Sequence, residues 1–293
     1  MDPTLSAFLR SWDVRLDLSL LILGFGIAYT IGWLKLRRRE TRLANYWRIS
    51  SYYAGLIALA LALFSGLDVF QTQLFFIHML QHLFLWMIAP PLLLLANPMP
   101  FILWALPKPE RQQLGRLLTQ RSLFRQIFVW ITSPWMVWLA YTINLVTWHD
   151  PNPYNAAIEN DFLHDIEHFT FFYTGLAFWW HVIGTAPKFH KQRSIPMRMG
   201  LIVVSYFVNL FVGVSITFSP DVIYTYYEGV PRVANISVKT DQTIGGLLMW
   251  IPGGMMYLMT FLILGINLVA ESERRARLGD KQRQLKYQKV AES

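Results

Sequence analysis

Long apolar stretches separated by short, basic polar segments dominate the chain. An α-helix needs about 20 apolar residues to cross the hydrocarbon layer of a membrane, and buried helices of soluble proteins have shorter apolar stretches. About seven such stretches can be drawn along the 293 residues. They lie at roughly 18–34, 49–67, 73–96, 128–147, 160–184, 199–218 and 242–269. The pattern therefore predicts an all-α membrane protein, a bundle of about seven transmembrane helices.

The stretch at 160–184 has the weakest membrane pattern of the set. Its first turns contain Asp161, His164, Asp165, Glu167 and His168, and its remainder, FTFFYTGLAFWW, is apolar. Ionisable side chains inside a membrane are costly and normally have a functional reason. We therefore expect this stretch to be a span that carries polar groups near one end.

The composition agrees with a membrane protein and leaves little room for anything else. Hydrophobic residues make up 54% of the chain and charged residues only 15%, whereas soluble domains have about a quarter charged residues. We expect two parts, a seven-helix membrane domain at 1–270 and a basic cytoplasmic tail at 271–293. Cysteine is absent, which excludes disulfides and thiolate metal sites.

The distribution of basic residues predicts the orientation. The net charge is +8, and all but four of the 26 lysines and arginines fall in segments that alternation of the spans places on one side. The four exceptions are Arg10, Arg15, Arg232 and Lys239. Because cytoplasmic loops are enriched in lysine and arginine, we expect the N-terminus outside and the C-terminus in the cytoplasm. We therefore interpret the positive charge as the signal that orients the chain in the lipid membrane. The sequence contains no nucleic-acid-binding pattern. The pattern of residues 107–127, a basic segment between two predicted spans, indicates an amphipathic helix that lies on the cytoplasmic leaflet.

Five of the seven histidines are expected at one depth, in or near the outer leaflet. His78 and His82 lie in HMLQH, His164 and His168 in HDIEH, and His149 ends the fourth stretch. Residues four apart lie on the same face of a helix, about one turn from each other. Two such pairs on facing helices would offer several imidazole nitrogens to a single ion.

This donor set suits a metal ion, copper first and zinc or iron next. Met79 and Met249 offer thioethers at the same depth, and Asp165 and Glu167 are expected to orient the imidazoles as outer groups. The alternative is that the histidines only form hydrogen bonds between helices. The predicted metal ligands are His78, His82, His149, His164, His168, Asp241 and Gln242.

Other functions remain open at this point. His168 and His181 are 13 residues apart, a spacing found where one helix holds two b haems, although a partner helix with a matching pair is also needed. A membrane metalloenzyme, such as a di-iron or copper oxidase, usually has several carboxylates with its histidines, and this chain offers only Asp165, Glu167 and Asp241. A transporter lacks a continuous polar path, and a retinal pigment lacks a lysine in 242–269. We expect a protein that binds and releases an ion and catalyses no reaction.

Four segments resemble a known family. HMLQHLFLWMIAPPLLLL, WHDPNPYNAA, HDIEHFTFFYTGLAFWW and DQTIGGLLMWIPGG are similar, in this order, to the CtaG family of caa-type cytochrome c oxidase assembly factors. The single-span copper chaperone that shares the CtaG name carries cysteine, which is absent here. His181 departs from the resemblance, since a proline is expected after Trp179 and Trp180.

The resemblance implies a multi-pass protein of the bacterial inner (plasma) membrane that supplies or handles copper during oxidase maturation. The partners it implies are cytochrome oxidase subunits and an extracytoplasmic copper chaperone. The polar positions that match the family motifs are the seven predicted ligands named above.

Overall fold

The structure is a computed structural model that describes residues 3–40, 42–119, 121–233 and 235–291, and within these ranges it contains helices and no strand. The elements are α1 (Pro3–Arg10), α2 (Leu16–Arg37), α3 (Tyr46–Phe64), α4 (Gly66–Phe70), α5 (Phe75–Leu83), the π-helix η1 (Phe84–Ile88), α6 (Ala89–Leu95), α7 (Pro98–Ala105), α8 (Lys108–Leu117), α9 (Leu123–Ile131), α10 (Pro134–Trp148), α11 (Pro151–Glu159), α12 (Asp161–Ile183), α13 (Ile195–Phe218), the 3-10 helix η2 (Thr225–Glu228), α14 (Val238–Trp250) and α15 (Pro252–Ala291). The predicted all-α class is confirmed.

Five helical stretches of the described chain are long and apolar enough to cross a membrane. They are Leu16–Arg37, Tyr46–Phe70, Phe75–Leu95, Ile195–Phe218 and Val238–Gln284. A sixth candidate consists of α9 and α10, which meet at a bend of 53°. The chain is therefore a multi-helix membrane protein, whereas seven spans and the direction of insertion stay predictions. The 23-residue α12 corresponds to the fifth predicted span, at 160–184, and is not among these candidates.

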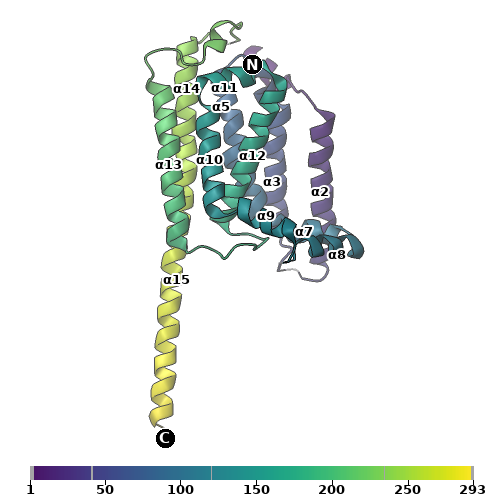
Figure 1. Ribbon diagram of the computed structural model, residues 1–293, viewed down its shortest axis with the longest axis vertical. Helices are drawn as coiled ribbons and strands as arrows, with labels where there is room; N and C mark the ends of the chain where they lie inside the picture. The colour runs from purple at the N-terminus through teal and green to yellow at the C-terminus, as the bar shows by residue number, and fades with distance from the viewer. Residues whose placement is uncertain (1–2, 41, 120, 234, 292–293) are drawn as a thin grey trace.

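The bundle has α3, α5, α10 and α12 at its centre, with the pair α13 and α14 on one flank and α2 on the other (Figure 1). The α15 helix extends well beyond the bundle and contains residues 271–291 of the predicted tail, whose last two residues lie outside the described part of the chain. The α2 helix packs mainly on α7, at one end of the bundle. Gly32 permits that contact, because a Cβ at this position would lie 1.7 Å from the carbonyl oxygen of Phe101.

A π-helical turn and two prolines interrupt the helix that carries two of the histidines. Pro90 has no N–H, so the carbonyl of Trp86, four residues earlier, loses its usual helical donor. The indole Nε1 of Trp179 on α12 donates to that carbonyl at 3.0 Å. This hydrogen bond links α12 to the helix formed by α5, η1 and α6. The starts of α5 and α12 lie at the same end of the bundle (Figure 1).

The segment after residue 96 differs from the sequence prediction. The loop expected there contains α7, and the span expected at 128–147 is a bent pair, with α9 ending at Ile131 and α10 starting at Pro134. Pro134 stands at the first position of α10, where its missing N–H costs nothing. The amphipathic helix predicted in 107–127 corresponds to α8, none of whose ten residues is buried.

Candidate metal centre

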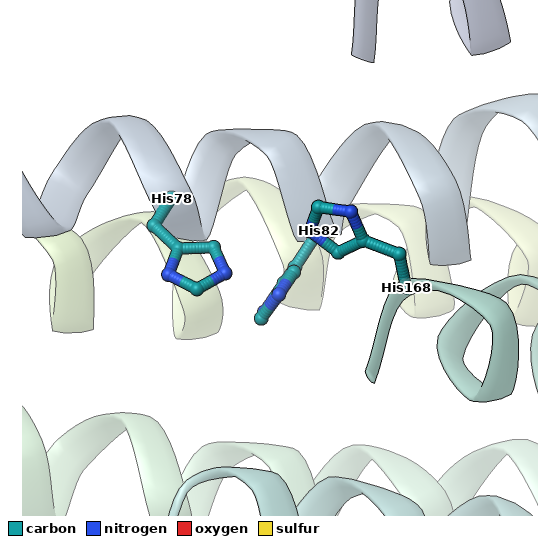
Figure 2. Close-up of side chains that lie close together, drawn as sticks. All are labelled: His78, His82 and His168. Atoms are coloured by element: carbon teal, nitrogen blue, oxygen red, sulfur yellow. The ribbon is translucent and has the colours of Figure 1, made fainter. Parts of the chain in front are cut away.

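Two helices bring histidines together inside the bundle. His78 and His82 lie one turn apart on α5, and His168 lies near the start of α12. One ring nitrogen from each of the three lies within 4.8 Å of the others, and all three side chains are buried. Figure 2 shows the two α5 rings side by side and the His168 ring approaching them from α12.

A carboxylate and a fourth histidine complete the cluster. Glu167 is fully buried, with Oε1 3.4 Å from Nε2 of His82 and Oε2 3.7 Å from Nε2 of His78. Ligand atoms of His78, His164 and Glu167 also lie within 4.8 Å of one another. We call His78, His82, His164, Glu167 and His168 the histidine cluster. It consists of two overlapping triads that share His78.

The polar atoms that face each other in the histidine cluster have no hydrogen-bond partners among the described residues. This holds for Nε2 of His78, His164 and His168, both ring nitrogens of His82 and both carboxylate oxygens of Glu167. Buried polar atoms are nearly always hydrogen-bonded, and an unpaired buried charge costs several kcal/mol. A cation held in either triad would accept one lone pair from each of its three residues, so the residues fit a bound metal ion.

His149 lies beside the histidine cluster. Its ring centroid is 6.0 Å from that of His82, and its Nδ1 donates to the carbonyl of Leu145 at 2.7 Å. It faces a cavity of about 20 Å³ that Met79 and Met249 also line. The predicted thioether donors are thus next to His82 and His149, outside both triads.

Asp241 has a different environment from the one expected of a ligand. Its carboxylate accepts hydrogen bonds from the backbone N–H groups of Phe75 and Phe76, at 3.0 and 2.9 Å, and pairs with Arg232 at 2.7 Å. These are the first residues of α5, whose N-terminal N–H groups have no partner within the helix. Asp241 therefore fixes the start of the helix that carries His78.

Gln242 also binds backbone groups. Its Oε1 accepts from the N–H of Ile223 at 2.6 Å, and its Nε2 donates to the carbonyls of Ile216 and Asp221 at 3.3 and 3.2 Å. The structure does not bring Asp241 or Gln242 into the histidine cluster.

Residues 27–271 match the family described as "Cytochrome c oxidase caa3 assembly factor", and this range contains every residue of the histidine cluster. The chain belongs to the caa3 assembly factor family. The resemblance inferred from the four motifs is confirmed.

Curated relatives of the chain are longer proteins of mycobacteria. An uncharacterised protein of Mycobacterium leprae is 24% identical over 258 residues, which cover 85% of this chain and 38% of the relative. Uncharacterised proteins of Mycobacterium bovis and Mycobacterium tuberculosis are each 25% identical over 287 residues, covering 93% of this chain and 41% of each relative. The chain thus spans about two fifths of the length of these relatives. No solved structure matches it.

Two tyrosines extend the candidate site on the side of His78. The Tyr154 hydroxyl lies 2.7 Å from Nδ1 of His78 and 2.7 Å from the hydroxyl of Tyr227, which donates to the carbonyl of Gln71 at 2.8 Å. Both tyrosines are fully buried. The sequence interpretation missed them, because a tyrosine in NPYNAA or in TYYE carries no signal of its partner.

The two remaining histidines lie at the other end of the bundle. Nε2 of His181 donates to the carbonyl of Thr132 at 2.8 Å, and Nε2 of His190 is 3.0 Å from the hydroxyl of the same residue. Partial burial, followed by the charge of Arg193, lowers the pKa of His190. These residues belong to a separate hydrogen-bonded group near the start of α10.

Proposed function

We propose that the chain is a cytochrome c oxidase assembly factor that binds copper in the histidine cluster and passes it to an oxidase subunit. Membership in the caa3 assembly factor family supports the role in oxidase assembly. The copper step rests on one observation, the convergence of unpartnered imidazole nitrogens and a buried carboxylate from α5 and α12.

The charge of the histidine cluster favours a monovalent ion. His78, His82 and His168 present neutral imidazoles, which suit copper, zinc and iron, and the chain has no thiolate to add. Glu167 supplies one negative charge to a fully buried site. A Cu(I) ion with this carboxylate makes a neutral unit, whereas a divalent ion leaves a net charge that burial makes costly. We therefore assign Cu(I) as the cargo.

The two overlapping triads give a route for release. The triad of His78, His82 and His168 is entirely buried, whereas the triad of His78, His164 and Glu167 includes the half-buried His164. An ion that keeps its bond to His78 can exchange the other ligands one at a time. Such exchange would move the ion toward the start of α12 while at least one protein ligand stays bound to it.

The predicted topology places this end of the bundle on the extracytoplasmic side of a bacterial inner membrane. There the protein would receive copper from an extracytoplasmic chaperone and deliver it to an oxidase subunit within the membrane. No bond is made or broken other than metal–ligand bonds, so the function is binding, positioning and release.

Metal analysis of the purified protein tests the proposal. Protein prepared in lipid nanodiscs with copper under reducing conditions should hold stoichiometric copper, and X-ray absorption should show only nitrogen and oxygen neighbours. The double variant His82→Ala/His168→Ala should lose the metal, whereas His181→Ala/His190→Ala should keep it. Wild-type protein that retains no copper under these conditions would rule the proposal out.

A further inference from the structure

A large cavity lies between α2, α3, α4 and α12 and reaches the histidine cluster. Its volume is about 990 Å³, and its walls include Leu18, Leu59, Leu63 and Phe172. It lies beside the first two turns of α2, and the later part of α2, from Phe25 on, packs against α3 and α7 (Figure 1). His164 and His168 on α12 are among its lining residues, so the cavity borders the histidine cluster.

The polar end of this cavity is acidic. Asp13, Asp68, Asp161 and Asp165 line it, and Arg15 is the basic residue among its lining groups. A cleft of one sign of charge with apolar walls focuses the electric field and raises the local concentration of the opposite ion. The potential at this opening therefore attracts cations toward α12.

A second observation connects the acidic opening to a ligand. His168 is 6% exposed, lines this cavity and also belongs to the buried triad, and its Nε2 has no hydrogen-bond partner among the described residues. A buried imidazole with a free lone pair in the wall of an acidic cavity is a receptor for a cation.

We propose that the cavity between α2, α3 and α12 is the entry vestibule through which a metal cation reaches the histidine cluster. This inference rests on the proposed copper-binding function and adds the route. The guanidinium of Arg15 lies 2.5 Å from Asp165 and 3.0 Å from Asp17, so it holds the start of α2 against α12. An arriving cation competes with Arg15 for Asp165, one residue from His164.

Loading kinetics test the electrostatic part of the inference. Wild-type protein in nanodiscs is mixed with Ag(I), a redox-stable stand-in for Cu(I), and the change in tryptophan fluorescence gives the rate. Asp13→Asn/Asp161→Asn should load at least about five-fold more slowly at low ionic strength, and the difference should shrink at high salt. The amount of metal bound at equilibrium should stay unchanged.

Two acids at the same end of the bundle provide the matched control. Glu159 ends α11 and Glu228 ends η2, which contacts α11, and neither lines the cavity. Glu159→Gln/Glu228→Gln removes the same charge and should load at the wild-type rate. Equal slowing of both double variants would show a general charge effect and overturn the vestibule.

A second experiment tests the space itself. The chain has no cysteine, so Leu18→Cys introduces a single thiol inside the cavity, and Leu20→Cys introduces one at a 70% exposed position on the same helix. Complete modification with a fluorescein maleimide should slow Ag(I) loading for the protein modified at residue 18 and leave the one modified at residue 20 unaffected. Unchanged loading in both would overturn the proposed route. Wild-type protein that binds no Ag(I) or Cu(I) at equilibrium would defeat the proposed function itself, and the vestibule with it.

Discussion

Nδ1 of His78 donates a hydrogen bond to the hydroxyl of Tyr154, and the direction of this bond follows from the atoms beyond it. The carbonyl of Gln71 can only accept, so the Tyr227 hydroxyl must donate its single proton there. Tyr154 must then donate to Tyr227, and its oxygen is left to accept from His78. The proton of His78 is therefore on Nδ1, and Nε2 directs its lone pair into the histidine cluster.

Removal of the Tyr227 hydroxyl should weaken copper binding. In Tyr227→Phe, Tyr154 is free to donate to Nδ1 of His78, which would place the proton on Nε2 and block the ligand. Loss of an outer hydrogen bond of this kind typically lowers metal affinity by about 10–100-fold. The measurement is competition for Cu(I) with a coloured chelator. Tyr226→Phe, a change in the same 3-10 helix, is the control. Wild-type affinity in Tyr227→Phe would contradict the proton assignment.

Replacement of Glu167 by glutamine should have opposite effects on the metal-free and metal-bound protein. The substitution keeps the shape of the side chain and removes a buried carboxylate that has no hydrogen-bond partner among the described residues. Without metal, the thermal unfolding midpoint should equal or exceed that of the wild type, because no charge has to be buried. The increase in that midpoint on adding Cu(I) should become smaller. A loss of metal-free stability would show that Glu167 has a structural partner instead.

Asp241 should behave as a structural residue. Asp241→Ala leaves two N–H groups of α5 and the guanidinium of Arg232 without their acceptor. Breaking a buried pair in this way costs about 3–5 kcal/mol of unfolding free energy. The thermal midpoint should fall equally with and without Cu(I), and the increase caused by copper should be retained in the folded protein. Selective loss of that increase would make Asp241 a ligand, as the sequence pattern predicts.

The sequence anticipated those parts of the site that depend on spacing along one helix. The HxxxH pairs on α5 and α12 need only the 3.6-residue period and the alternation of spans to be placed at one depth. Asp241 could not be placed this way, because its partners, Phe75 and Phe76, lie more than 160 residues away in the chain. A carboxylate at the start of one helix has the same sequence pattern whether it binds a metal or caps another helix.

Elements outside the apolar periodicity were also missed, for a related reason. The α7 helix is a short helix that packs on α2 because Gly32 permits close approach, and such a contact depends on tertiary structure alone. The π-helical turn at Phe84–Ile88 has apolar residues that fit a regular helix equally well. Only the prolines that follow signalled an irregularity, and the sequence could not show that Trp179 would compensate for it.

Removal of the His164 side chain should slow the release of copper and leave the amount of bound copper unchanged, in contrast to removal of His82 or His168. It belongs to the more exposed triad, so His164→Ala leaves the three buried imidazoles of His78, His82 and His168 in place. Three ligands are sufficient to hold Cu(I), and copper content after purification should match that of the wild type. The exchange step toward the start of α12 loses its acceptor ligand, which should slow the transfer of bound Cu(I) to an added chelator by about ten-fold. Parallel measurements on His168→Ala provide the contrast, since that variant should bind copper poorly from the outset. If His164→Ala loses copper as completely as His168→Ala, the two triads act as one site and stepwise release along α12 is wrong.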